Sequence, residues 1–380
     1  MMAKLRIGII FGGRSGEHEV SLMSAQSVLK VLTTEAYDVT LIGITQEGRW
    51  VTGQHALDAL VSKDFSNTSA STLLPVPESG RLYAMQATGS TYSMNALKEL
   101  DVVFPVLHGT YGEDGALQGL LELAGIPYVG SGVAASALGM DKGLFKDVMR
   151  ARGLPVLDSV ILTRAFIHAN LADAVAQAET LASYPLFVKP ANLGSSVGIS
   201  KCRNRMELEN GLKTAAVYDR RILVERGLNS PRELEVSVLG NDDPRASVPG
   251  EIRPADEFYT YTAKYSDDRT ELIIPAPLSE DQNRSLQQLA VEVFKACDCA
   301  GMARVDFLLD QETGNFYISE INTIPGFTRV SMYPKLWEAS GIRYADLIKT
   351  LIDLALERKN EMDQLDRTYQ SQSLKGGADA

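Results

Sequence analysis

The sequence predicts a three-domain protein that combines α/β and α+β architecture and begins with an open parallel α/β domain. Its 380 residues are 45% hydrophobic and 22% charged, which is the balance of a soluble chain that buries sizeable cores. At about 100–200 residues per domain, this length corresponds to two or three domains. The pattern also changes along the chain, from an α/β pattern to helices alternating with short β-rich runs, and then to several strand candidates.

The first domain is expected over residues 1–130. An apolar run ends at Gly12-Gly13 and is followed by apolar residues at helical spacing, which predicts a strand, a glycine turn and a helix. Two further strands and a helix are predicted, at 39–44, 102–107 and 116–124. Residues 53–98 are rich in small and polar residues, and we interpret them as an elaborated connection whose function the sequence does not reveal.

The second domain, a small α+β unit, is expected over residues 131–220, and the third over 221–361. The elements predicted in the second are a helix at 142–151, strands at 160–162 and 186–189, and a helix after Asn204. Those predicted in the third are strands at 221–225, 232–239, 271–274, 302–309 and 315–321, and helices at 280–297 and 344–358. Residues 362–380 are polar and are expected to form a flexible tail.

Composition excludes several classes of function. The net charge of −11 and the pI near 5.0 argue against nucleic acid, because a polyanion needs a basic face. No apolar run approaches the roughly 20 residues that cross a bilayer, and the start of the chain lacks a signal-peptide cleavage region, so we expect a cytoplasmic protein. The three cysteines and four scattered histidines predict neither a disulfide framework nor a zinc site.

A predicted β-hairpin near the C-terminus carries the most chemical information. Its residues alternate around a turn centred on Thr313, which places Asp306 directly opposite Glu320. The same register pairs Arg304 with Asn322, so all four side chains share one face of the sheet.

Two carboxylates whose β-carbons lie about 4.5–5.5 Å apart repel each other unless a proton or a cation lies between them. Magnesium prefers oxygen ligands and is often held by one or two carboxylates together with phosphate oxygens. We therefore expect Asp306, Glu320 and Asn322 to hold the metal ion of a nucleotide. The alternative is a solvated strand face with a structural pair between Arg304 and a carboxylate.

A glycine- and serine-rich loop, residues 190–198, follows an apolar strand that ends in Lys189. Small residues let backbone N–H groups approach an anion closely, so this loop is suited to cover phosphates while Lys189 supplies positive charge. Because the lysine precedes the glycines, the loop is not a Walker A loop. The alternative is an ordinary surface turn.

Two further side chains fit a nucleotide site. Glu225 ends an apolar strand and is placed to accept a hydrogen bond from an adenine amino group, and Lys142 opens a helix and is expected to pair with phosphate. The alternative for both is a solvated surface position.

In their order and spacing, these segments resemble the D-alanine-D-alanine ligase family, whose members have the three-domain ATP-grasp fold. The resemblance runs from about residue 4 to residue 358. It rests on separated motifs at 12–21 (GGRSGEHEVS), 108–115 (HGTYGEDG), 139–142 (GMDK), 188–198, 263–265 (AKY), 304–306 (RVD) and 320–326 (EINTIPG).

The resemblance implies an enzyme that uses ATP to join two D-alanine molecules into D-alanyl-D-alanine for peptidoglycan synthesis. ATP would phosphorylate the carboxylate of the first D-alanine, and the amine of the second would attack the acyl phosphate, leaving ADP and phosphate as coproducts. Magnesium or manganese, as two ions, and a homodimer are implied as well.

The family's catalytic residues carry over onto this sequence. Glu17 resembles the acceptor for the first substrate's ammonium group, with Ser195 and Tyr265 in the same hydrogen-bonded set. Arg304 and the backbone N–H of Gly326 resemble the oxyanion site that stabilises the tetrahedral intermediate.

Binding residues carry over in the same way. Lys264 and Ser331 resemble the group that holds the second substrate's carboxylate, and His108 the lining of the first-substrate site, although a packed turn residue is the alternative for His108. The nucleotide contacts implied are Lys142, Lys189, Ser196, Glu225, Glu233 and Phe258. Residues 258–269 resemble a lid that excludes water from the acyl phosphate, and Tyr265 favours D-alanine over D-lactate as second substrate.

Two rival functions stay open. One is a ligase of the same fold that uses D-serine or D-lactate as acceptor. The other is a nucleotide-binding regulator that has lost catalysis, which the presence of Lys264, Arg304, Asp306 and Glu320 disfavours. A plain structural protein is disfavoured further.

Overall fold

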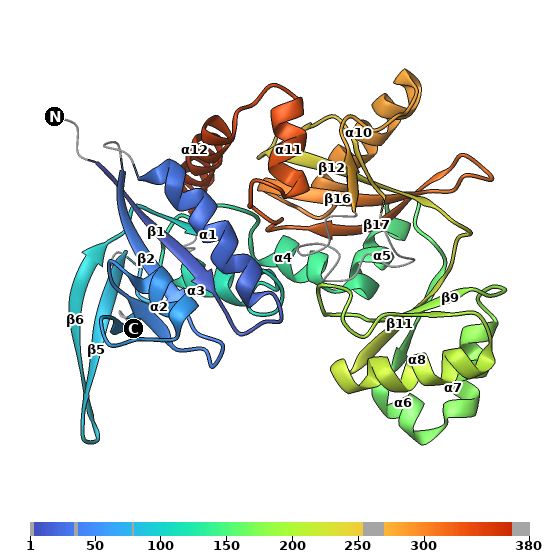
Figure 1. Cartoon of the computed structure of the whole chain (residues 1–380), viewed down its shortest axis with the longest axis horizontal. Coiled ribbons are helices and arrows are strands. Elements are labelled where there is room, and N and C mark those ends of the chain that lie inside the picture. The colour runs from blue at the N-terminus through green and yellow to red at the C-terminus, as the bar shows by residue number, and fades with distance from the viewer. Residues whose placement is uncertain (1–3, 34–36, 78–79, 254–269, 367–380) are drawn as a thin grey trace, which may run out of the picture.

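The computed structural model describes residues 4–33, 37–77, 80–253 and 270–366. Three β-sheets, each accompanied by helices, form three adjoining bodies (Figure 1). The mixed α/β and α+β architecture predicted from the sequence is confirmed. None of the helices in the described ranges is long and apolar enough to cross a membrane.

The N-terminal sheet has the strand order β6-β5-β4-β3-β2-β1-β7. Its strands are β1 (Leu5–Gly12), β2 (Tyr37–Ile44), β3 (Trp50–Thr52), β4 (Ser69–Leu73), β5 (Arg81–Thr88), β6 (Thr91–Glu99) and β7 (Val102–Pro105). The strands β2, β1 and β7 are parallel, as expected, and β3 to β6 extend the sheet with antiparallel pairs. The helices of this part are α1 (His18–Leu32), α2 (Ala56–Ser62) and α3 (Ala116–Leu123).

The stretch at residues 53–98 is more regular than its composition indicated. It contains α2 and the strands β4, β5 and β6, and β6 forms the outer edge of the sheet. Most residues of β6 are exposed. A strand without a buried face has no alternation of apolar and polar residues, which explains why the pattern was not recognised.

The central sheet has four antiparallel strands in the order β10-β9-β11-β8. Its strands are β8 (Ser159–Thr163), β9 (Leu186–Pro190), β10 (Ser200–Cys202) and β11 (Arg221–Arg226), and its helices are α6 (Arg164–Ala169), α7 (Leu171–Glu179) and α8 (Arg205–Tyr218). Alternate residues of β9 are buried in the core of this body, including Leu186 and Val188. Phe187 and Lys189 therefore point to the opposite face, toward the cavity described below.

The C-terminal sheet has the order β15-β14-β12-β16-β17, with β13 paired to β12. Its strands are β12 (Arg232–Gly240), β13 (Arg245–Ala246), β14 (Gly250–Arg253), β15 (Glu271–Ile273), β16 (Gly301–Leu309) and β17 (Phe316–Asn322). The accompanying helices are α4 (Val133–Met140), α5 (Lys142–Ala151), α10 (Glu280–Ala296), α11 (Met332–Ala339) and α12 (Tyr344–Asp363). Phe145 and Met149 of α5 belong to the same core as Phe294 of α10, so α5 packs against this sheet although it precedes the central one.

The division into domains at 130 and 220 stays a prediction. Strand β11 pairs with β8 and β9, so a boundary at residue 220 would separate it from its own sheet. The N-terminal and C-terminal bodies share a core in which Phe104 and Phe327 meet edge to face, with ring centroids 5.7 Å apart. This shared core fixes the N-terminal body against the loop that follows β17.

The N-terminus of α10 offers a stability test at residues that do not line the cavity. The side chain of Ser279 accepts a hydrogen bond from the backbone N–H of Gln282, and the Gln282 side chain accepts one from the backbone N–H of Ser279. Ser279→Ala removes half of this capping box, so the free energy of unfolding should fall by about 1 kcal/mol in guanidinium denaturation. Ser285→Ala, at an exposed position inside the same helix, is the control and should be neutral or slightly stabilising. Equal losses in the two variants would contradict this account.

Candidate active site

The hairpin of β16 and β17 has the predicted register at its open end. Arg304 pairs with Asn322 and Asp306 pairs with Glu320. Closer to the turn the register shifts by one residue, so that Phe307 pairs with Ile318, and Ser319 is the extra residue of a β-bulge. The bulge lets Ile318 and Ile321 both lie in the core while Glu320 stays on the same face as Asp306.

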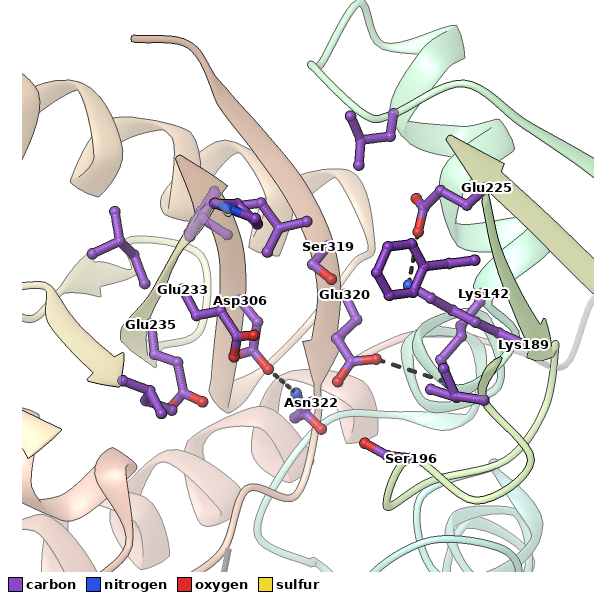
Figure 2. Close-up of a pocket in the computed structure, with 18 of the residues that line it drawn as sticks. Lys142, Lys189, Ser196, Glu225, Glu233, Glu235, Asp306, Ser319, Glu320 and Asn322 are labelled. Atoms are coloured by element: carbon purple, nitrogen blue, oxygen red, sulfur yellow. Dashed lines mark hydrogen bonds and ion pairs between the residues drawn. The ribbon is translucent and has the colours of Figure 1, made fainter. Parts of the chain in front are cut away.

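The two acids of this face already have cationic neighbours. The Arg304 guanidinium donates to both carboxylate oxygens of Asp306, from Nε at 2.7 Å and from Nη2 at 2.6 Å. Asn322 Nδ2 donates to Asp306 Oδ2 at 3.0 Å, and Lys142 Nζ lies 3.8 Å from Glu320 Oε2 (Figure 2). Burial alone would lower the pKa of Arg304, but the carboxylates around it outweigh burial and hold that pKa well above its ordinary value. Arg304 is therefore a permanent cation beside the acidic pair.

This face fits the metal ion that the sequence predicts. Asp306 and Glu320 supply carboxylate oxygens, and the Asn322 amide oxygen is left as an acceptor because the amide nitrogen donates to Asp306. Hard oxygen donors suit magnesium. Within the described ranges no three or more His, Cys, Asp or Glu side chains form a metal-binding group. A cation held here would therefore depend on further ligands from a bound molecule, as magnesium does when it binds with phosphates.

The acidic face lines a cavity of about 1070 Å³. Most of the predicted site residues line it, namely Glu17, Lys142, Lys189, Ser195, Ser196, Glu225, Glu233, Asp306, Glu320 and Asn322. They come from all three bodies, so the cavity exists only where the three meet. This volume is at the upper end of the range for sites that bind small molecules and cofactors.

One end of the cavity contains a buried charge cluster. Glu225 forms ion pairs with two lysines, with Lys189 at 2.7 Å and with Lys146 of α5. Burial alone would raise the pKa of Glu225, but the two lysines outweigh it and hold this pKa at about 2. Glu225 is therefore an ionised acceptor fixed in place, and its role as a solvated surface residue is excluded because only 2% of it is exposed.

Another part of the cavity wall is formed by the N-terminal body and the glycine-serine loop. Ser195 Oγ donates to Glu17 Oε1, which joins residues far apart in sequence. Ser195 and Ser196 both have positive φ, 53° and 57°, a strained conformation for residues with a side chain, and such strain is concentrated at functional sites. A β-carbon at Gly194 would lie 2.8 Å from Glu17 Oε2, so a side chain at this position would displace the Glu17 carboxylate from its place beside Ser195.

Four predicted residues do not line the cavity. Arg304 is half-buried on β16, and Gly326 and Ser331 lie in or next to the loop between β17 and α11. His108 is buried and does not line the cavity; its Nδ1 lies 3.0 Å from the carbonyl oxygen of Ile324 and its Nε2 lies 3.1 Å from Ser24 Oγ. Phe258, Lys264, Tyr265 and the proposed lid at 258–269 lie outside the described residues.

Three residues of the site were not singled out from the sequence. Lys146 follows Lys142 by one helical turn, and Glu235 follows Glu233 by two residues on β12. Helical and strand periodicity therefore predict that each lies on the same face as its predicted neighbour. Glu113 belongs to the 108–115 motif and accepts from the backbone N–H groups of Gly109, at 2.7 Å, and Ile324, at 3.1 Å. Burial, together with the negative charge of Glu17, raises the pKa of Glu113 to about 8.

Comparisons with known proteins agree with this geometry. A family model described as D-ala D-ala ligase N-terminus matches residues 6–131, and one described as D-ala D-ala ligase C-terminus matches residues 148–353. The D-alanine–D-alanine ligase of Natranaerobius thermophilus is 48% identical over 365 residues, covering 96% of this chain and 98% of the relative. That of Clostridium novyi is 48% identical over 358 residues, covering 94% and 100%.

Solved structures give the same answer. The D-alanine-D-alanine ligase from Coxiella burnetii matches with a TM-score of 0.77 and 37% identity, covering 96% of this chain and 97% of that one. A D-Ala:D-Ser ligase from Enterococcus faecalis matches with a TM-score of 0.80 and 34% identity, covering 93% and 100%. On these sequence and structural grounds, the chain belongs to the D-alanine–D-alanine ligase family, with its ATP-grasp fold.

Proposed function

We propose that this protein uses ATP to join two D-alanine molecules into D-alanyl-D-alanine through an acyl phosphate, as a step in making peptidoglycan. The observation that carries the proposal is one cavity lined by two chemically different groups of side chains. Lys142, Lys189 and the acidic face of β16 and β17 suit a nucleotide with its cation, and the hydrogen-bonded pair of Glu17 and Ser195 lines the same cavity.

The nucleotide end is assigned from charge. Glu225, ionised and fixed by two lysines, is an acceptor for the adenine amino group. Glu233 on β12, the next strand along the chain, is assigned to the ribose. Lys142, Lys189 and Ser196 are assigned to the phosphates because cationic and hydroxyl donors stabilise transferring phosphoryl groups. Phe258, outside the described residues, is assigned to this end by family resemblance alone.

Asp306, Glu320 and Asn322 would hold magnesium or manganese, and we propose two ions. When bound, the cation supplies positive charge that neutralises the phosphate oxygens during transfer. Lys142, which approaches both Glu320 and the carbonyl oxygen of Leu193, connects this face to the phosphate loop.

The substrate end is assigned from hydrogen bonding. Glu17, oriented by Ser195, would accept from the ammonium group of the first D-alanine and hold its carboxylate toward the phosphoryl donor. Arg304 and the Gly326 N–H would stabilise the oxyanion that forms when the second amine attacks. Lys264, Ser331 and Tyr265 are assigned to the second substrate and to closure of the site.

His108 is assigned to the first-substrate site through the loop it holds. Its Nδ1 contacts the Ile324 carbonyl, while Glu113 accepts from the Ile324 N–H. The two side chains therefore hold the backbone of Ile324 on both sides, only two residues before Gly326. Burial lowers the pKa of His108, so the ring is neutral at pH 7 and contributes no charge.

A second acceptor is a specific alternative, since one structural relative is a D-Ala:D-Ser ligase. The Lys264-Tyr265 pair of this chain favours D-alanine by resemblance. We further propose a cytoplasmic homodimer, on the same resemblance.

Incubation with ATP, magnesium and D-alanine should yield ADP, phosphate and D-alanyl-D-alanine, detected by mass spectrometry. L-alanine should give no dipeptide, because the site that holds ammonium and carboxylate together is chiral. D-serine or D-lactate offered with D-alanine tests the alternative acceptors. A mixed product in excess of D-alanyl-D-alanine would replace this function with that of the alternative ligase, and no nucleotide turnover with any acceptor would indicate the regulator.

The acidic face gives a second prediction. Glu320→Gln removes one of the two facing charges, so dipeptide synthesis should fall by about 100-fold and the half-saturating magnesium concentration should rise. Glu312→Gln, in the exposed turn of the same hairpin, is the matched control and should leave both quantities unchanged. Unaltered magnesium dependence in Glu320→Gln would remove Glu320 from the metal site.

A further inference from the structure

Glu235 of β12 is a third carboxylate in the acidic row. In the strand register Glu235 lies opposite Asp306, and Asp306 lies opposite Glu320, so the three acids cross three neighbouring strands on one face. Figure 2 shows Glu235 beside Asp306, on the side away from Lys142. Only 5% of Glu235 is exposed, and neither the nucleotide nor the metal assignment above uses it.

One side chain that Glu235 contacts is Arg304. Their charged atoms, Arg304 Nε and Glu235 Oε2, lie 3.0 Å apart. Arg304 donates two hydrogen bonds to Asp306 from Nε and Nη2. A guanidinium has five N–H donors in a rigid fork. Arg304 therefore retains donors for a substrate oxygen while Asp306 and Glu235 fix the position of the guanidinium.

Asp306 alone is a poor anchor for this arginine. It is a candidate cation ligand and also accepts from Asn322, so its negative charge is divided among three partners. A cation held at Asp306 weakens the attraction between Asp306 and Arg304, because the carboxylate charge is then neutralised locally. Glu235 lies on the far side of Asp306 from Glu320 and places a second negative charge beside Arg304.

Stability alone does not account for Glu235. Burying another carboxylate next to two others is costly, and an apolar side chain in a buried ion-pair position is often as stable or more so. A carboxylate here is explained if the orientation of Arg304 matters for chemistry.

We propose that Glu235 is a positioning residue that holds the Arg304 guanidinium toward the reacting carbonyl oxygen when Asp306 is engaged by the cation. The inference rests on the proposed function and assigns Glu235 to the second half of the reaction. In that half-reaction the amine nitrogen bonds to the acyl carbon, the bond between that carbon and the phosphate oxygen breaks, and the departing phosphate takes up the proton that the amine loses. If the oxyanion of this step is poorly stabilised, water hydrolyses the acyl phosphate instead. The products are then D-alanine and phosphate and not the dipeptide.

The test is the ratio of dipeptide formed to phosphate released, measured with ATP, magnesium and saturating D-alanine. The wild-type ratio should be close to one. In Glu235→Gln the rate of dipeptide formation should fall by about 10–100-fold, as for other residues that orient a catalytic group, while phosphate release falls less, so the ratio drops well below one. Glu235→Asp keeps the charge and should restore part of the ratio.

Glu251→Gln is the matched control. Glu251 is also buried in this sheet and accepts from Arg232 at 3.1 and 2.7 Å, so this variant loses a comparable arginine–carboxylate pair. The unfolding temperature of both variants, measured with a chelator present, depends neither on bound metal nor on catalytic turnover. We expect both to be destabilised and only Glu235→Gln to change the ratio.

Three results would overturn the inference. A ratio near one in Glu235→Gln, with lower rates throughout, would make Glu235 merely structural. A ratio near one with a raised half-saturating magnesium concentration would make it a cation ligand. Wild-type protein that forms no dipeptide would defeat the proposed function itself, which distinguishes that failure from the other two.

Discussion

The site depends on the electrostatic repulsion between Asp306 and Glu320, which the hairpin of β16 and β17 holds opposite each other. The β-bulge at Ser319 preserves this arrangement, because it lets two isoleucines enter the core without turning Glu320 away. Two carboxylates on one face are stable only near positive charge. Arg304 on the same sheet and Lys142 on α5 provide positive charge beside the two acids. A bound cation would provide the rest.

Positive charge comes from several parts of the chain, which explains why the site lies where three bodies meet. Helix α5 packs in the core of the C-terminal sheet and presents Lys142 to Glu320 and Lys146 to Glu225. The N-terminal body contributes Glu17 and also holds the backbone of Ile324 through His108 and Glu113. Binding of the amino-acid substrate and positioning of the oxyanion loop are thereby coupled in one set of contacts.

The sequence predicted what depends on short-range order. The pairing of Asp306 with Glu320 follows from alternation around a nearby turn, and it is confirmed. The bulge was missed because it is set by which residues the core accepts. Lys146 and Glu235 were not singled out because the side chains they contact lie far away in the chain, although their spacing places them on the same faces as Lys142 and Glu233. The sequence left a packed position of His108 as one of two alternatives, and the side chain is buried. The exposed strand β6 left no periodic signal, and β11 was assigned to the following unit because pairing partners are not visible in a single strand.

Electron paramagnetic resonance of Mn²⁺, titrated into the protein with a non-hydrolysable ATP analogue, tests directly whether Asp306 and Glu320 share a cation. We predict bound Mn²⁺ in the wild type and strongly weakened binding in Asp306→Asn. Binding should be retained in Glu312→Gln, a variant of an exposed acid in the same hairpin. Equal Mn²⁺ affinity in the wild type and in Asp306→Asn would contradict this prediction, because the facing acids would then have no cation to share.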